Sequence, residues 1–167
     1  MLADGLQYHG RMIVLLLLLT AFVPSMQRPS DIVKWSATVS PAAVGPGDTV
    51  KISLTATIQT GWKLYALMQP SAAAQALKIQ VADGAPLTIV TKQIVGPESK
   101  VYEDAALGLN VRYHDRAATF VVPVKVSTGL AAGKLRIPLR VTFQACTDNI
   151  CLLPFTSPVD VEVEVRK

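Results

Sequence analysis

The chain has 167 residues, of which 50% are hydrophobic and 17% charged, and its formal net charge is +4. This length and composition suit one ordinary globular domain with an apolar core. The basic residues are scattered along the chain, so the basic cluster that nucleic-acid binding requires is missing. We therefore expect no nucleic-acid partner.

An apolar run over residues 13–23 follows Arg11 and precedes Pro24 and Ser25. It is too short to cross a hydrocarbon core, which needs about 20 helical residues. Its proportions are those of a signal-peptide core. We predict a signal peptide over residues 1–25 that is cleaved after Ser25, with membrane contact only during export. The alternative is an uncleaved anchor lying at the membrane interface.

The remaining residues, 26–167, are predicted to form one soluble exported domain. Export implies an oxidising compartment, in which paired cysteines form disulfides. Alternation of apolar and polar residues dominates this part of the chain and predicts half-buried strands. The clearest strands are expected at 33–39, 50–58, 77–81, 120–126, 135–143 and 159–165, with short extended pieces at 62–65 and 111–114. Residues 87–95 are also predicted as a strand, whereas 96–109 have no period and are predicted as a long loop.

The last two predicted strands carry complementary charges on their outer faces. Lys134, Arg136 and Arg140 lie on the first, and Asp160, Glu162 and Glu164 on the second. Opposed charges across an antiparallel pair stabilise it, so these strands are expected to be hairpin partners with a solvated outer face. Eight or so short strands without an amphipathic helix predict an all-β, immunoglobulin-like antiparallel β-sandwich.

Cys146 and Cys151 are the only cysteines, and they lie between the two hairpin strands. Both sulfurs should therefore meet at one end of the hairpin, close enough to bond. A ring of six residues stabilises a fold by only about 2 kcal/mol, against about 4.7 for a hundred-residue loop. If the strand runs on unbroken, Ala145 faces the core and Cys146 faces outward, although a bulge at Ala145 would reverse this.

The spacing and the compartment leave two interpretations equally open. One is a redox-active pair; the other is a non-catalytic binding module whose hairpin disulfide fixes a recognition loop. The spacing is not the Cys-x-x-Cys of a thioredoxin. Asp148 between the cysteines, and Glu103 and Asp104 elsewhere, would disfavour a thiolate, so an exchange reaction would need a partner with its own activated thiol.

Metal and cofactor chemistry have little support in the sequence. His114 is a lone histidine on a strand, Met68 is expected to pack, and four-ligand zinc spacing is missing. The sequence also lacks a Ser/His/Asp arrangement and a glycine-rich phosphate loop. We expect no metal and no cofactor.

Three segments carry a resemblance to a known family. The cysteine segment Val141–Pro154, the strand Gly61–Tyr65 and the acidic segment Glu103–Gly108, with Tyr113 following, are similar to parts of the N-terminal domain of the thiol:disulfide interchange protein DsbD family. The resemblance spans roughly residues 33–165, and the cysteine segment is its specific part. It implies an immunoglobulin-like sandwich with the cysteine pair at one end.

The resemblance also implies a function. Domains of this family are periplasmic and take electrons from a thioredoxin-like domain or protein, then pass them to oxidised exported proteins. By this resemblance, Cys151 would form the mixed disulfide with partners and Cys146 would resolve it. Full-length family members continue into a membrane-embedded domain and a thioredoxin-like domain, whereas this chain ends at Lys167. We therefore expect a reductase-type component that depends on a partner, and whether it counts as an enzyme by itself stays open.

The resemblance further assigns a cap loop, Glu103 to Gly108, that shields the sulfurs until a partner moves it. Tyr65 and Asp104 match family positions around the cysteine pair. Ala105 and Ala106 stand where the family has an acidic and an aromatic residue. Shielding is therefore expected to be weaker, unless Tyr102 or Leu107 supplies it.

Overall fold

The computed structural model describes residues 27–105 and 107–167. The predicted signal peptide, residues 1–25, and the first residue of the predicted domain lie outside the described residues. Within the described part, no helix combines the length and apolar character that a membrane crossing requires.

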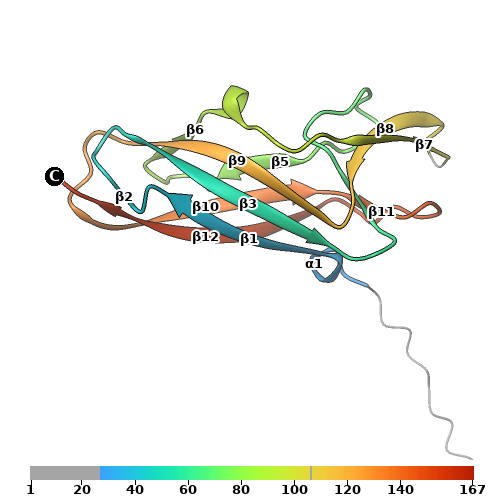
Figure 1. The fold of residues 1–167 in the computed structure, drawn as a ribbon, viewed down its shortest axis with the longest axis horizontal. Coiled ribbons are helices and arrows are strands. Elements are labelled where there is room, and N and C mark those ends of the chain that lie inside the picture. Colours follow the sequence, from blue (N-terminus) through green and yellow to red (C-terminus); the bar gives the residue numbers. More distant parts are fainter. Residues whose placement is uncertain (1–26, 106) are drawn as a thin grey trace, which may run out of the picture.

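The described residues form a β-sandwich, antiparallel except for the short parallel pair of β2 and β12, with a smaller third sheet at one end (Figure 1). One large sheet has the order β1 (Val33–Ser40), β3 (Thr49–Ile58), β9 (Ala117–Val126), β6 (Leu87–Ile89). The other has the order β2 (Ala43–Val44), β12 (Phe155–Val165), β10 (Gly133–Phe143), β5 (Lys78–Val81). The third has the order β11 (Ala145–Cys146), β4 (Lys63–Tyr65), β8 (Leu109–His114), β7 (Lys100–Asp104). The short helices are α1 (Pro29–Ile32) and η1 (Thr91–Gln93). This architecture confirms the predicted all-β, immunoglobulin-like fold.

The core lies between the two large sheets and follows the alternation of the sequence. In β3, every second side chain from Val50 to Ile58 is buried. The same holds for β12 from Ser157 onward, where the intervening acidic residues face water. Because successive side chains of a strand point to opposite faces, this pattern places one apolar face of each sheet inside. The sandwich therefore has its own apolar core, and the cysteines lie at one end of it.

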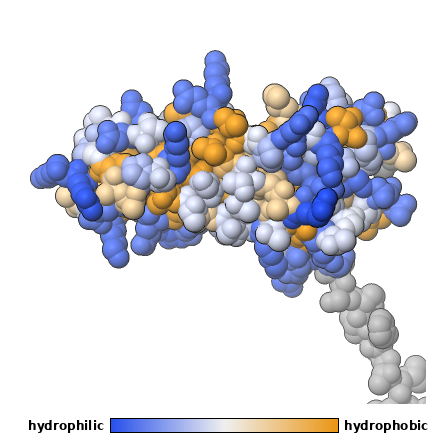
Figure 2. All heavy atoms as spheres, viewed as in Figure 1, coloured by the Kyte–Doolittle hydropathy of each residue, from blue (hydrophilic) through white to orange (hydrophobic). Residues whose placement is uncertain are grey.

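The charged hairpin forms as predicted. Across β10 and β12, Lys134 lies opposite Glu164 and Arg136 opposite Glu162. Arg136 forms its ion pair with Asp160, the diagonal neighbour two residues before Glu162, at 2.6 Å. The Arg136 guanidinium lowers the pKa of the Asp160 carboxyl. Figure 2 shows hydrophilic side chains spread over the visible face with apolar ones between them.

Two predictions about local structure were wrong. Within the expected loop 96–109, residues Lys100–Asp104 form β7, which pairs with β8. This is an edge strand, and its charged and exposed residues hide the alternation that reveals buried strands. Within the expected strand 87–95, β6 ends at Ile89 and is followed by the 3₁₀ turn η1.

Candidate functional site

A disulfide joins Cys146 to Cys151 at the end of the sandwich. The two residues oppose each other in a tight hairpin. The Leu152 N–H donates to the Ala145 carbonyl at 2.9 Å, and the Thr147 N–H donates to the Ile150 carbonyl at 2.8 Å. Residues 147–150, which we call the cysteine loop, therefore form a compact turn that keeps the two sulfurs adjacent.

The two cysteines differ in exposure, and Cys146 does not face outward as it would on an unbroken strand. Cys146 is fully buried, with 0% of its surface exposed, whereas Cys151 is only half-buried. The reason is a break at Gln144, where the chain leaves the β10 sheet and joins β4 as β11. Beyond this break Ala145 enters the main core and Cys146 enters a second cluster. Cys151 is therefore the more exposed of the two cysteines.

The second cluster surrounds the disulfide where the strands of the third sheet meet. Its buried members are Tyr65, Ala74, Val111 and Cys146, and its partly buried members are Tyr102, Leu107, Leu109, Tyr113 and Cys151. The disulfide is thus packed against tyrosine rings and aliphatic side chains, separately from the sandwich core.

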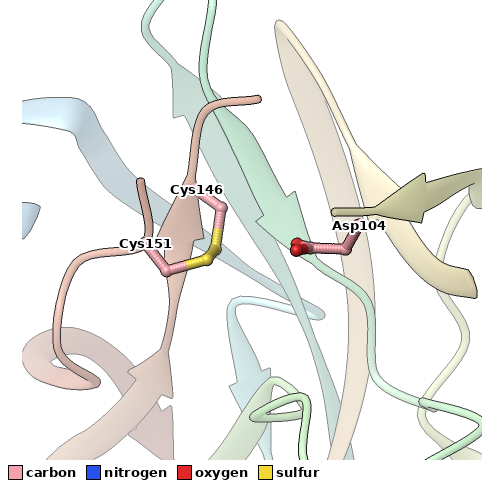
Figure 3. A group of neighbouring side chains, drawn as sticks. All are labelled: Asp104, Cys146 and Cys151. Atoms are coloured by element: carbon pink, nitrogen blue, oxygen red, sulfur yellow. A yellow bond between two sulfur atoms is a disulfide. The ribbon is translucent and has the colours of Figure 1, made fainter. Parts of the chain in front are cut away.

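A hydrogen-bonded group lies beside Cys151. The Tyr65 hydroxyl donates to the Asp104 carboxylate at 2.5 Å and lies 3.6 Å from the Cys151 Sγ. The Tyr102 hydroxyl donates to the same carboxylate oxygen at 2.7 Å. Asp104 is buried, and its side chain points toward the disulfide (Figure 3). Burial, and then the Asp104 carboxylate, raise the pKa of Tyr65 and of Tyr102 well above the ordinary value, so both stay neutral donors.

Strands β7 and β8 form a hairpin, residues 100–114, that we call the cap hairpin. Asp104 closes its turn, because the Asp104 carbonyl accepts from the N–H of Gly108 at 2.8 Å and its carboxylate accepts from the N–H of Leu107 at 3.1 Å. Gly108 has a φ of 63°, a left-handed conformation that glycine adopts without strain. At the base, Lys100 and Asp115 form an ion pair at 2.8 Å, and Lys100 lowers the pKa of Asp115.

The residues that the resemblance assigned to the cap are divided between two faces. Tyr65, Asp104 and Leu107 lie with the disulfide. Glu103 is exposed and, as a strand neighbour of Asp104, points to the opposite face. Gly108 and Ala105 are exposed, and residue 106 lies outside the described residues.

Sequence reasoning missed Lys63. Its ammonium forms an ion pair with Asp148 of the cysteine loop and lies 4.5 Å from the centre of the Tyr102 ring. The contact between Lys63 and the cysteine loop is created by the register of β4 and β11, which places Lys63 opposite Cys146. A two-residue strand such as β11 gives no periodic pattern from which this register could be predicted.

Among the described residues, one group of three potential metal ligands was found. The ligand atoms of Asp104, Cys146 and Cys151 lie within 4.8 Å of one another. With the sulfurs bonded to each other, no thiolate is present, so the oxidised site does not offer the ligands that soft metals bind. His114 is not in this group: it packs against Phe120 with ring centres 5.4 Å apart, and burial lowers its pKa.

Two solved structures have a similar fold. The N-terminal domain of DsbD from Neisseria meningitidis, in the reduced form, matches with a TM-score of 0.52 and 16% identity, covering 83% of this chain and 91% of that chain. The N-terminal periplasmic domain of ScsB from Proteus mirabilis matches with a TM-score of 0.55 and 18% identity, covering 83% of this chain and 49% of that chain. At these identities the likeness concerns the fold alone. No curated protein sequence matches this chain.

The family is shown by sequence. The family model described as "Thiol:disulfide interchange protein DsbD, N-terminal" matches residues 30–162, which include the cysteine hairpin, Tyr65 and the cap hairpin. With its paired cysteines and its immunoglobulin-like sandwich, this chain belongs to the family of DsbD N-terminal domains.

Proposed function

We propose that this domain carries electron pairs from a thioredoxin-like donor to oxidised exported proteins in the periplasm, through Cys146 and Cys151. The observation that carries the proposal is the unequal exposure of the two cysteines, since Cys151 is half-buried and Cys146 is fully buried. Exchange requires access to one sulfur. A signal peptide over residues 1–25 and a mature domain over 26–167 belong to the same proposal.

In the first half of the cycle, a donor thiolate attacks the Cys151 Sγ. The bond to Cys146 breaks, and Cys146 leaves as a thiolate that takes up a proton. The second donor thiol then attacks the donor's own sulfur in the mixed disulfide and releases Cys151. The donor ends as a disulfide and this domain as a dithiol, so two electrons and two protons have been transferred.

In the second half, the Cys151 thiolate attacks the disulfide of an oxidised acceptor. Cys146 then attacks the Cys151 Sγ, and the acceptor leaves in its reduced form. This division of roles is supported by the geometry, because Cys151 is the more exposed cysteine, whereas the buried Cys146 lies opposite Cys151 and is placed for an intramolecular step.

The groups around Cys151 would restrain this chemistry until a partner docks. The Tyr65 hydroxyl lies 3.6 Å from the Cys151 sulfur, but its single proton is donated to the Asp104 carboxylate, so it has no proton to donate to a thiolate there while that bond lasts. The buried Asp104 carboxylate itself disfavours a thiolate, because it is a nearby negative charge. A donor that brings its own activated thiolate would avoid this barrier.

The surface around Cys151 suits a protein partner. Ile150 is 56% exposed and Leu153 is 84% exposed, on either side of the cysteine, and Phe155 follows at 36%. Exposed apolar side chains next to a reactive group are typical of docking surfaces. We propose that the thioredoxin-like partner contacts these side chains while its thiol approaches Cys151.

The proposal is tested by trapping the mixed disulfide. Cys146→Ala, with Cys151 activated as its thionitrobenzoate disulfide, is mixed with a reduced thioredoxin that keeps only its attacking cysteine. Thionitrobenzoate leaves as the thiolate, and a stable one-to-one covalent complex should appear on a non-reducing gel. The complex should form faster than the reaction of the same variant with a small thiol of equal thiolate content, because docking aligns the sulfurs.

The matched control is Cys151→Ala, in which the remaining sulfur is buried, and it should yield little complex. If both variants react alike, or if thioredoxin reacts no faster than a small thiol, the carrier function is wrong. The alternative, a binding module with a structural disulfide, is then supported if the wild-type pair has a reduction potential below about −300 mV, as structural disulfides do.

A further inference from the structure

Lys63 occupies an unusual place for a lysine. Only 14% of its side chain is exposed, although it lies on a short strand near the end of the molecule. On β4 it shares a face with Tyr65, two residues along, and it lies opposite Cys146 of β11. Its side chain is therefore directed to the same side of the sheet as the disulfide and the second cluster.

The Lys63 ammonium contacts two separate elements. It lies 4.5 Å from the Tyr102 ring centre and 5.7 Å from the Tyr113 ring centre, both in the cap hairpin. It also forms an ion pair with Asp148, whose side chain is 79% exposed at the tip of the cysteine loop. A cation over aromatic faces is attracted by the rings, and partial burial strengthens the contact. Lys63 therefore connects the cap hairpin to the cysteine loop.

We propose that Lys63 is a positioning residue that ties the cysteine loop to the aromatic side of the cap hairpin and thereby favours the disulfide over the dithiol. This inference rests on the exchange function proposed above, because it concerns the same cysteine pair. It gives a role to the ion pair of Lys63 with Asp148, which the exchange steps themselves do not use.

The direction of the effect follows from linkage. The disulfide holds both arms of the cysteine hairpin, and with them Asp148, in the position that Lys63 contacts. When the disulfide opens, this covalent constraint on the loop is lost, and holding Asp148 in place then has an added entropic cost. A contact that is stronger in one of two states shifts the equilibrium toward that state. Removing Lys63 should therefore make the disulfide easier to reduce.

The test is the equilibrium of the purified domain with glutathione. One protein disulfide and two reduced glutathiones give one protein dithiol and one glutathione disulfide, a transfer of two electrons and two protons. In Lys63→Met, which keeps an apolar stem of similar length, the equilibrium constant should shift toward the dithiol by roughly two- to fivefold, the range for a partly exposed ion pair. Lys63→Arg keeps the charge and the attraction to the aromatic faces, so its shift should be smaller than that of Lys63→Met.

Asp148→Asn changes an exposed side chain and tests the other partner of the ion pair. It should shift the equilibrium in the same direction, and the double variant should shift less than the product of the single shifts, as expected for residues that interact. Lys51→Met, at an exposed position of β3, is the matched control for loss of one charge and should leave the equilibrium unchanged. High salt should bring the wild type closer to Asp148→Asn.

The proposal is overturned if Lys63→Met leaves the glutathione equilibrium unchanged, or if the shifts of Lys63→Met and Asp148→Asn multiply in the double variant. Should Lys63→Met not fold, the wild type and Asp148→Asn compared at low and high salt decide the matter. Because glutathione replaces the protein partner, this result is separate from the mixed-disulfide experiment, in which the carrier function itself can fail.

Discussion

The buried hydroxyl of Tyr65 lies between the Asp104 carboxylate and the Cys151 sulfur. It donates to Asp104 at 2.5 Å and lies 3.6 Å from the Cys151 Sγ. Burial and the neighbouring carboxylate raise the pKa of this hydroxyl, so the folded protein holds its proton more tightly than the unfolded chain does. The same contacts therefore affect both the stability of the cluster and the environment of the exposed sulfur.

Tyr65→Phe should lower the free energy of unfolding at neutral pH by about 1–3 kcal/mol, because a buried acceptor loses a donor. It should also change the alkaline pH dependence. A raised pKa in the folded state means that stability is complete below the unfolded pKa of about 10 and is lost as pH rises above it. Part of this alkaline loss should disappear in Tyr65→Phe.

Urea unfolding at neutral and at several alkaline pH values measures both effects. Tyr113→Phe is the matched control, since the Tyr113 ring belongs to the same cluster and packs edge-on against Tyr102 at 5.1 Å. Because Tyr113→Phe leaves the Tyr65 hydroxyl in place, the part of the alkaline loss that is assigned to Tyr65 should remain. An alkaline profile of Tyr65→Phe that coincides with the wild type would contradict the assignment of the raised pKa to this hydroxyl.

At the scale of elements, the cap hairpin packs against the cluster that holds the disulfide, and we predict that it limits access to the sulfurs. Leu107 at its turn packs against the cluster that contains Cys151, whereas Ala105 is exposed. Tyr102 and Leu107 are the partly buried cap-hairpin side chains, with Leu109 and Tyr113, that pack in this cluster.

Leu107→Ala should speed reduction of the disulfide by dithiothreitol by roughly fivefold, because losing about 1 kcal/mol of apolar contact raises the population of the open hairpin by that factor. Val101→Ala is the control, because Val101 lies in the same hairpin but is 56% exposed, and its reduction rate should be that of the wild type. Equal rates for Leu107→Ala and the wild type would mean that the hairpin does not limit access.

The sequence predicts elements well where one face of a strand is buried in the main core. Alternation located β3, β9, β10 and β12, and the charge pattern paired β10 with β12. Alternation did not reveal β7, which is an exposed edge strand. It also left the orientation of Cys146 open, because the burial of Cys146 depends on the change of sheet at Gln144. The contact between Lys63 and Asp148 could not be predicted, because the two residues are far apart in the sequence. Their proximity depends on the register of β11, and a two-residue strand shows no periodic pattern.

For the whole molecule, the disulfide lies outside the main core. Cys146 and Cys151 enclose a ring of only six residues, and the apolar core of the two large sheets packs separately from their cluster. A carrier of electron pairs must remain folded in both redox states, because each cycle passes through the dithiol. A domain stabilised mainly by its disulfide would unfold each time it received electrons.

Reduction should therefore leave the sandwich folded. In the chain-entropy model, a ring of this size contributes about 2 kcal/mol, so the reduced domain should unfold cooperatively in urea at a somewhat lower midpoint with a similar slope. Far-ultraviolet circular dichroism in the absence of urea should be the same for both states, and the oxidised protein under identical conditions is the reference. Loss of cooperative unfolding on reduction would instead indicate a structural disulfide, because the protein could not then persist as the dithiol that an exchange cycle requires.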